Sequence, residues 1–331
     1  LALLDEHLDL AAEAQVVLAR TETKSGRFDA ALRAAEEAYE MLRERPDCAL
    51  LAEASRALGP AHAELGDIVA ARDCFIDCLV CCRRLEDEEG VAGALNNLGI
   101  LAKRSGDLAA AVDCFERALE IDESLGRAAA VARRLNNLGI ALYRMSRWDE
   151  AEKHLRRSRE IFVRLGATRD IVSVESALGN LRRVRRDWSG ARRHFESVLA
   201  TSREHGYLRA EALALEFLGD LEKDLGNHAV ALERLDAALH SARRLSHDSD
   251  VIGEVLRRRA EVLMELGRFD EAERDCVEAL RLCRTIGDRL EEGSALRVLA
   301  ALTYARGRWS EAGALIGRSE RTLRRTGATF E

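Results

Sequence analysis

Apolar residues recur along the chain at helical spacing, and turn residues interrupt them at regular intervals. In residues 90–127, a first set of apolar residues falls at helical spacing in a segment that ends before Gly106: Ala94, Leu95, Leu98, Ile100 and Leu101. Gly106 can adopt the left-handed conformation that ends a helix, and Asp107 is a favourable N-cap for the next one. A second helical set follows: Ala111, Val112, Phe115, Ala118, Leu119 and Ile121. The pattern predicts two antiparallel helices of about 16 to 18 residues, which cannot bury their apolar faces without neighbours.

The same turn recurs eight times at nearly constant spacing. Its copies begin at Gly26, Gly66, Gly106, Ser146, Arg186, Gly226, Gly267 and Gly307, in steps of 40 or 41 residues. Periods of this size are typical of stacked supersecondary units, each packed only on its neighbours. We therefore predict an all-α solenoid of about eight antiparallel helix pairs, in a single array over residues 1–331. The expected units are 8–46, 47–87, 88–127, 128–167, 168–207, 208–248, 249–288 and 289–327.

Aligned units show which positions the packing requires. A small residue recurs midway along the first helix: Gly59, Gly99, Gly139, Gly179, Gly219, Ala260 and Ala300. An alanine recurs early in the second helix: Ala31, Ala71, Ala111, Ala151, Ala191, Ala231, Ala272 and Ala312. Four residues after this alanine stands a larger side chain in most units: Phe75, Phe115, Leu155, Phe195, Leu235, Cys276 and Ile316. Helix axes approach closely only where one side chain is small, so we expect each large residue to fill the space beside a small one.

These columns resemble the tetratricopeptide repeat (TPR) family over essentially the whole chain. The resemblance rests on Leu-Gly in the first helix, Gly-Asp at the turn, and alanine followed four residues later by Phe or Leu. It implies a right-handed superhelix. The usual unit has 34 residues and a proline near its end, whereas these units have about 40, with glycines such as Gly126 and Gly166 in place of that proline. Such longer units are similar to the TPR arrays of bacterial regulators, which occur beside kinase, ATPase, protease or DNA-binding modules.

Composition narrows the functional class. The net charge of −7 argues against general nucleic-acid binding, which needs a basic face. No apolar stretch is long enough for a membrane span, and the start has no basic signal region, so we expect a cytoplasmic protein. Leu1 falls where a preceding second helix would end, and residues 328–331 begin as another unit would. We therefore expect a fragment of a longer chain.

Catalytic motifs are missing from the sequence. It contains no GxxxxGK[ST], HExxH or GxSxG motif, so we expect neither enzymatic activity nor a cofactor. Eight cysteines are present: Cys48, Cys74, Cys78, Cys81, Cys82, Cys114, Cys276 and Cys283. Cys74, Cys114, His154 and His194 occupy equivalent positions in successive units, but helix axes about 8 to 10 Å apart cannot bring all four to one tetrahedral ion. Core packing is the favoured interpretation of the cysteines, and a metal site or redox role is the alternative.

The first helices contain the candidate binding residues. In the TPR family the concave face of these helices holds a peptide, and asparagines there bond its backbone. Asn97 and Asn137 match those asparagines, and Asn96 and Asn136 precede them. An amide can donate to and accept from a peptide group whatever the side chain. The alternative is that these amides bond neighbouring helices or water. Ala177 stands at the next equivalent position, so any such ladder is short.

Several basic residues extend this candidate groove. A partial match to the carboxylate clamp of chaperone-binding TPRs places Arg56, Asn97 and Arg133 at clamp positions, but Pro60 and Asn137 replace residues that the clamp needs. Lys103, Arg104, Arg144 and Arg183 lie near the ends of first helices. Arg183 belongs to a basic run with Arg182, Arg185, Arg186, Arg192 and Arg193. This run is either a solvated helix–turn–helix corner or a contact for acidic peptide, phosphate or nucleic acid.

The sequence thus favours a protein- or peptide-binding scaffold or sensor module of a bacterial regulatory or signalling protein. We expect the partner to lie in the concave groove of the second to fifth units. The alternative hypothesis is homotypic assembly, or intramolecular inhibition of a fused effector domain.

Overall fold

The computed structural model describes residues 2–24, 27–43, 49–244 and 250–324. Over these residues the chain forms sixteen helices and no strand. The N-terminal eight are α1 (Ala2–Lys24), α2 (Phe28–Leu42), α3 (Ala49–Glu64), α4 (Ile68–Arg84), α5 (Glu88–Ser105), α6 (Leu108–Ser124), α7 (Ala128–Arg144) and α8 (Trp148–Leu165). The remaining eight are α9 (Thr168–Val184), α10 (Trp188–His205), α11 (Leu208–Asp224), α12 (His228–Arg243), α13 (Asp250–Glu265), α14 (Phe269–Thr285), α15 (Arg289–Ala305) and α16 (Trp309–Arg324).

The predicted all-α array of eight helix pairs is confirmed. The first helix, α1, runs without a break from Ala2, whereas the first unit expected from the sequence begins at residue 8. Its leucines and alanines continue the helical pattern in the N-terminal direction, and no turn residue interrupts them. Leu1 and the expected opening of a further unit at residues 328–331 lie outside the described residues.

The turns between paired helices form as the sequence predicts. Gly106 ends α5 with φ 88°, in the left-handed region that costs glycine little. In the equivalent turns, the side chain of Asp67 accepts from the backbone N of Ala70 at 3.0 Å, and that of Asp187 accepts from Gly190 at 2.9 Å. Each cap satisfies an amide that the helix itself cannot bond.

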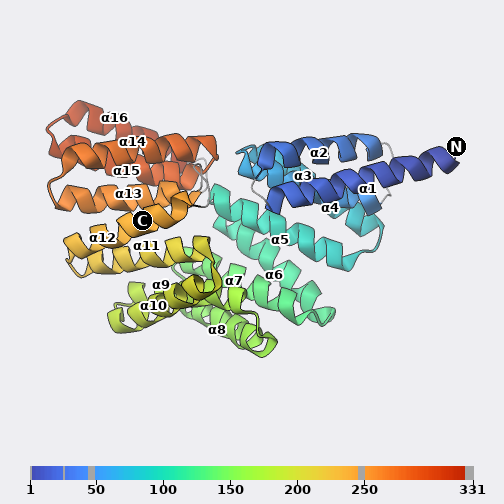
Figure 1. Cartoon of the computed structure of the whole chain (residues 1–331), viewed down its shortest axis with the longest axis horizontal. Coiled ribbons are helices and arrows are strands. Elements are labelled where there is room, and N and C mark those ends of the chain that lie inside the picture. Colours follow the sequence, from blue (N-terminus) through green and yellow to red (C-terminus); the bar gives the residue numbers. More distant parts are fainter. Residues whose placement is uncertain (1, 25–26, 44–48, 245–249, 325–331) are drawn as a thin grey trace. The chain divides into compact units, whose positions relative to one another are not determined.

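The chain divides into two compact units, each with a core of its own (Figure 1). The first comprises Leu1–Lys103 and Ala109–Arg134, and the second comprises Arg104–Leu108 and Leu135–Glu331. In the first unit, α2 to α5 contribute a continuous set of buried side chains that includes Leu42, Leu51, Cys78, Cys82 and Leu95. In the second, the largest buried cluster runs from α9 to α16.

Small and large residues interlock as the aligned columns predict in the units that have the recurrent glycine, whereas Ile316 of the last unit is exposed and Leu315 beside it is buried instead. A Cβ atom added to Gly99 would lie 2.6 Å from Phe115, and one added to Gly179 would lie 2.5 Å from Phe195. Neither space would admit a methyl group without movement of the ring. The recurrent glycine is therefore required by the close approach of the paired helices.

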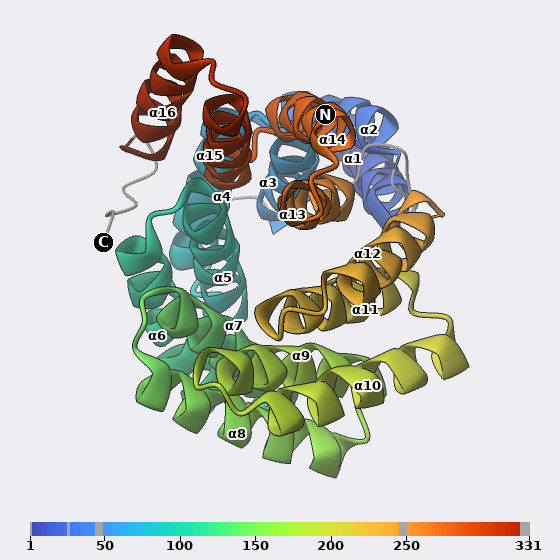
Figure 2. The same cartoon turned by 90° about the vertical axis from the view of Figure 1, so that its left-hand side faces the viewer.

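Within the second unit, the first helices of successive pairs form one layer. α9 contacts α11, α11 contacts α13, and α13 contacts α15, in addition to the contacts of each with its paired second helix. Figure 2 shows the pair of α9 and α10 next to the pair of α11 and α12. This layer contains the cavity described below.

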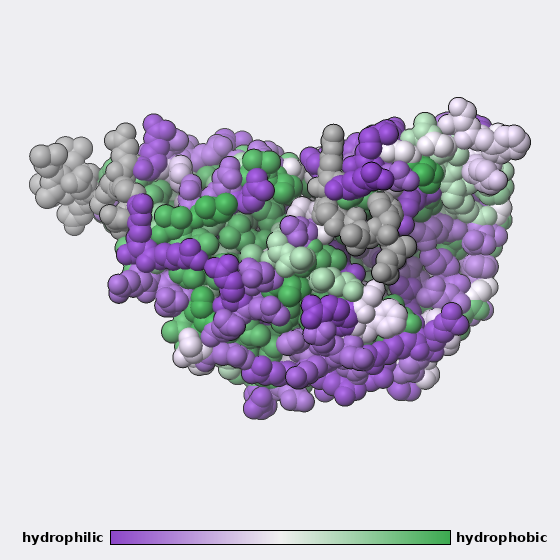
Figure 3. Space-filling model, turned by 180° about the vertical axis from the view of Figure 1, so that it is seen from behind, coloured by the Kyte–Doolittle hydropathy of each residue, from purple (hydrophilic) through white to green (hydrophobic). Residues whose placement is uncertain are grey.

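The surface combines hydrophilic and apolar areas (Figure 3). On α4, Val69, Ile76 and Val80 lie along one face with exposed fractions of 61%, 43% and 41%. On the last helix pair, Tyr304 and Trp309 are exposed. None of the described helices combines the length and apolar character needed to cross a membrane.

Candidate functional site

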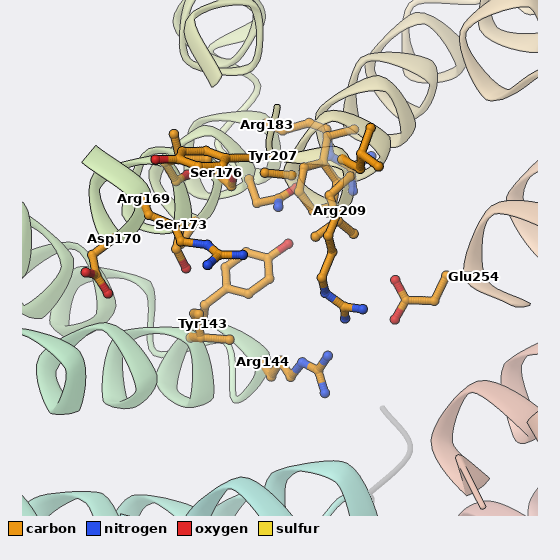
Figure 4. A pocket seen from close by; sticks show the side chains of 18 of the residues that line it. Tyr143, Arg144, Arg169, Asp170, Ser173, Ser176, Arg183, Tyr207, Arg209 and Glu254 are labelled. Carbon is orange, nitrogen blue, oxygen red and sulfur yellow. Dashed lines mark hydrogen bonds between the residues drawn. The ribbon is translucent and has the colours of Figure 1, made fainter. Parts of the chain in front are cut away.

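A cavity of about 760 Å³ opens on the layer of first helices in the second unit (Figure 4). Its walls come from α7, α9, α11, α13 and α15 and from the turn that precedes α11. The volume falls in the range of sites for small molecules and short peptide segments. Its polar lining residues are Tyr143, Arg144, Arg169, Asp170, Ser173, Ser176, Asn180, Arg183, Tyr207, Arg209, Glu254, Arg258 and Glu291.

Apolar and aromatic side chains line the remainder of the cavity. Ile140 comes from α7, Val172 from α9, and Leu213 and Phe217 from α11. The ring of Phe217 lies 5.3 Å from that of Phe195, which is fully buried in the core. This wall is therefore held by core packing and offers a preformed surface for an apolar group.

Three of the arginines that line the cavity are held by carboxylates of the protein. Arg183 donates to Asp224 at 2.9 Å and lies 3.3 Å from Asp220. Arg258 pairs with Asp220 and with the buried Glu216. Arg209 donates to both oxygens of Asp250, at 2.7 and 2.6 Å. These ion pairs connect α9, α11 and α13 across the cavity wall.

Two other arginines of the cavity make no ion pair with the residues that the structure describes. Arg144 is exposed at the end of α7. Arg169 lies over the ring of Tyr207, 5.4 Å from its centroid, in a cation–π contact. Two carboxylates of the lining, Asp170 and Glu254, have no hydrogen-bond or ion-pair partner within the same described ranges. Figure 4 shows Arg144, Arg209 and Glu254 directed toward one another at one side of the cavity.

Burial shifts the pKa values of the carboxyl groups in this layer. Desolvation and the neighbouring Glu291 raise the pKa of Glu254 to about 7, against the attraction of Arg258. Desolvation raises the pKa of Glu216 to about 8, although Arg258 opposes the shift. Burial also acts on Asp220, but Arg258 and Arg183 outweigh it and hold the pKa of Asp220 below its usual range. Neutral and charged carboxyls therefore coexist in this layer near pH 7.

Two of the ten residues predicted for the groove, Arg144 and Arg183, line this cavity. Arg144 forms no ion pair with the described residues, as expected of a residue that binds a partner. Arg183 forms ion pairs with Asp220 and Asp224. Asn136, also in the second unit, is buried and donates to Ser173 at 3.2 Å. Asn137 beside it is half-buried, and Arg104 lies near the end of α5.

The other five predicted residues belong to the first unit. Asn96 is buried and donates to the side-chain oxygen of Asn97 at 3.4 Å. Arg56 lies 3.7 Å from Glu53 on the same helix. Arg133 is exposed and Lys103 is half-buried. Their role in binding stays a prediction.

The basic run of the fifth unit serves largely as a set of links between repeats. Arg182 and Arg185 donate to Glu152, and Arg185 also donates to Asp149 at 2.5 Å. Arg192 donates to Glu222 at 2.6 Å. Because these partners lie in the preceding and following units, most of the run's charge is used inside the array.

The described cysteines are core residues, with Cys114 half-buried. Burial raises the pKa of Cys74, Cys78 and Cys276 to about 12, which keeps these thiols protonated and unreactive. Within the ranges that the structure covers, no three His, Cys, Asp or Glu side chains gather as a metal site requires. Cys48 lies outside the described residues.

Sequence patterns did not single out Arg169, Tyr207 or Glu254. The first two stand at the N-terminal ends of first helices, where the repeat demands no particular residue. An aromatic or charged residue at a position that packing does not constrain can indicate a binding site. In this chain, such residues point to the cavity only once the layer of first helices is known.

Comparisons with known proteins agree with this architecture. The family model described as tetratricopeptide repeat matches residues 50–124, 90–164 and 129–204, and the model described as MalT-like TPR region matches residues 168–330. No curated protein matches the sequence.

Solved structures with the same fold include three Rap proteins. One is a Rap protein complexed with Competence and Sporulation Factor, with a TM-score of 0.64, 14% identity and coverage of 96% of this chain and 92% of that one. The apo form of RapI has a TM-score of 0.68 and 15% identity, covering 83% and 98% of the two chains. The Rap conjugation gene regulator of plasmid pLS20, in complex with the Phr* peptide, has a TM-score of 0.59 and 12% identity, covering 96% of each. Identities this low show a shared fold and no more. From the family models and the repeated helix pairs, the chain belongs to the tetratricopeptide repeat family.

Proposed function

We propose that the second unit is a peptide-binding module, which holds an extended or helical segment of a partner in the cavity of its first helices. The observation that carries the proposal is the combination of a preformed apolar wall with Arg144 and Arg169, two guanidinium groups without carboxylate partners in the described residues. Apolar walls supply affinity, and a few convergent polar groups supply orientation. The module would bind without a catalytic step of its own.

The setting we propose is a regulatory or signalling protein of the bacterial cytoplasm, in which the bound segment acts as the signal. The description of one structural neighbour names a conjugation gene regulator in complex with a peptide, which supports this setting by fold alone. The buried thiols suit a reducing compartment.

Blocking the cavity tests the proposal. Ala177 lines the cavity on α9, so Ala177→Trp would occupy the space that the peptide needs. Ala200 lies exposed on α10, and Ala200→Trp is the matched control. The full chain and both variants are screened against a peptide library by fluorescence polarisation, with melting temperatures to check folding. We expect Ala177→Trp alone to lose binding; peptides that bind this variant as tightly as the parent would refute the assignment.

The amide side chains of Asn97 and Asn137 carry a separate proposal. Each stands on a first helix at the position where a TPR asparagine bonds peptide backbone. We propose that each serves this role within its own unit. Asn97→Ala and Asn137→Ala are measured singly, and each is expected to weaken peptides of unrelated sequence to a similar extent. Loss restricted to one peptide sequence would argue against a backbone contact.

Self-association is the second candidate, favoured by exposed aromatic residues. Trp309 and Tyr304 have exposed fractions of 70% and 66% on the last helix pair. Exposed aromatic groups of this size are enriched at protein interfaces. Light scattering over a range of concentrations distinguishes the candidates: a monomer at high concentration excludes self-assembly, and a dimer abolished by Trp309→Ser would support it.

A further inference from the structure

Glu254 is the one carboxyl of the cavity whose surroundings point to a particular ligand chemistry. It extends from α13 into the cavity, is half-buried, and has no hydrogen-bond or ion-pair partner in the described part of the chain. The acidic groups that act on its ionisation, Glu291 and Asp250, are engaged. Glu291 accepts from Arg257, and Asp250 accepts from Arg209. A half-buried carboxyl without such a partner is unfavourable unless it is protonated or a ligand bonds it.

Charged groups of both signs act on Glu254 from its own helix and from neighbouring ones. Glu291 on α15 and Asp250 on its own helix oppose its ionisation, while Arg258 on α13 and Arg144 on α7 favour it. Glu216 on α11 and Glu254 repel each other when both are ionised. Arg209 on α11 points toward it in Figure 4. Arg258 is shared by Glu216 and Asp220, and Arg209 is held by Asp250. Arg144 is therefore the guanidinium with unused hydrogen-bonding capacity at this wall.

This balance makes Glu254 a group that changes its charge near neutral pH. Burial and the nearby Glu291 bring its pKa to about 7. In the protonated form it is a hydrogen-bond donor, and in the ionised form it only accepts. A ligand carboxylate beside Arg144 would repel the ionised form and accept a hydrogen bond from the protonated one.

We propose that the wall formed by Arg144 and Glu254 binds a carboxylate of the peptide, and that Glu254 takes up a proton from solvent when this carboxylate binds. The proposal rests on the peptide-binding function above. A cationic group at this wall is disfavoured, since it would lie beside Arg144 and Arg209. In the complex, the ligand carboxylate would accept two charge-assisted hydrogen bonds from Arg144 and one from the Glu254 hydroxyl.

Proton uptake by Glu254 predicts a specific pH dependence of binding. If only the protonated form accepts the carboxylate, a pKa of about 7 gives about tenfold tighter binding at pH 6 than at pH 8. Glu254→Gln imitates the protonated carboxyl, so this variant should bind at pH 8 as tightly as the parent does at pH 6. Arg144→Gln should weaken acidic peptides at both pH values.

The experiment uses the full chain and an acidic peptide that binds the cavity in the library screen. Affinity is measured by calorimetry at pH 6 and pH 8 for this peptide and for two analogues, one with side-chain carboxylates changed to amides and one with an amidated C-terminus. The analogue that loses the pH dependence identifies the carboxylate. Glu265→Gln, on an exposed part of α13, is the matched control and should leave both affinities unchanged. Retention of the full pH dependence in Glu254→Gln, equal binding of both analogues and the parent peptide, or preference for cationic peptides would each overturn the proposal.

A small probe separates this inference from the proposed function. Thermal stabilisation by succinate is compared with that by succinamide, at pH 6 and pH 8, in the parent and in Arg144→Gln. If no peptide binds but succinate stabilises the parent at pH 6 through Arg144, the carboxylate site stands and the peptide function fails. If peptides bind without preference for carboxylates, the function stands and the inference fails. If neither probe binds, both are refuted.

Discussion

Two of the turns that follow a first helix place a residue other than glycine in the left-handed region. Ser146 has φ 58° and Arg186 has φ 59°, whereas the equivalent turns use glycines such as Gly106 and Gly226. A side chain with a Cβ atom is strained in this conformation by about 1 to 2 kcal/mol. The repeat imposes the turn, so the substituted residue has to adopt the same backbone geometry.

We predict that Arg186→Gly stabilises the protein by about 0.5 to 1 kcal/mol, because the strain relieved exceeds the added entropy of the unfolded chain. Arg186 is exposed and has no ion pair among the described residues, so no contact is lost. Chemical denaturation measures the change. Gly166→Ala is the opposite control: its φ is 63° and an added Cβ would meet open space, so a loss of about 1 kcal/mol would come from the backbone alone. A neutral or destabilising Arg186→Gly would contradict the strain argument.

The raised pKa of Glu254 also makes a prediction about stability. Between its ordinary pKa of 4.5 and its folded value of about 7, the folded chain binds more protons at this site than the unfolded chain. The contribution of Glu254 is therefore fully present below pH 4.5 and is lost as the pH rises through 7. Glu254→Gln should raise stability by about 3 kcal/mol at pH 8 and change little at pH 4.5. Paired melting curves at both pH values check this, since groups that Glu254 does not affect cancel in the difference; equal shifts at both would exclude a titrating Glu254.

Part of the candidate site could be predicted from the sequence, and the rest could not for a physical reason. Arg144 and Arg183 were predicted for the groove and line the cavity. Arg183 is nevertheless held by Asp220 and Asp224, which lie about one repeat away in sequence. Whether an arginine forms an ion pair within the protein depends on an acidic residue in the next unit and on the geometry of both side chains. The repeat pattern predicts neither of these.

At the scale of elements, a glycine packs against a large side chain in the second to sixth helix pairs. Gly179 and Phe195 are one such pair, and in the seventh unit the equivalent residues are the fully buried Ala260 and Cys276. The seventh unit thus has a larger residue on one helix and a smaller one on the other. The larger residue on the first helix occupies part of the volume that the smaller residue on the second helix leaves.

The alanine and cysteine of the seventh unit can be introduced into the fifth unit in place of Gly179 and Phe195. We predict that Gly179→Ala costs about 1 to 3 kcal/mol through overpacking and that Phe195→Cys costs about 2 to 4 kcal/mol through a cavity. In the double variant the added methyl group no longer meets the ring and fills part of the space that the ring leaves, so the loss should be smaller than the sum of the single losses by about 1 kcal/mol. Urea denaturation of the four proteins completes the cycle. Additive losses would show that the two side chains do not share one space.

Ion pairs between neighbouring units recur as the packing residues do. Arg185 donates to Asp149 and Glu152, and Arg306, three units later, donates to Asp270 and Glu273 at 2.5 and 2.7 Å. The same positions of the repeat supply donor and acceptors in both places. A run of arginines that suggested a ligand site from the sequence is therefore explained in part by the contacts between repeats.

At the scale of the whole molecule, the sequence predicted an all-α array of eight helix pairs because the repeat encodes them locally. Caps, turn glycines and apolar columns each act within one unit or between adjacent units. The division into two compact units was not predictable in this way. It falls within α7, between Arg134 and Leu135, where the repeat columns continue without interruption.

A nearest-neighbour architecture predicts how a local defect spreads. In a solenoid, each repeat is stabilised by its own packing and by the adjacent repeats. Gly179→Ala should therefore increase hydrogen exchange most in α9 and α10, less in α11 and α12, and not measurably in α1 to α4, which belong to the other compact unit. Hydrogen-exchange mass spectrometry of the parent and the variant measures this gradient, and Ala200→Trp on the exposed face of α10 controls for a surface change. A uniform increase along the whole chain would mean that the array opens as one cooperative body, so that binding in the cavity of the second unit would also stabilise the first.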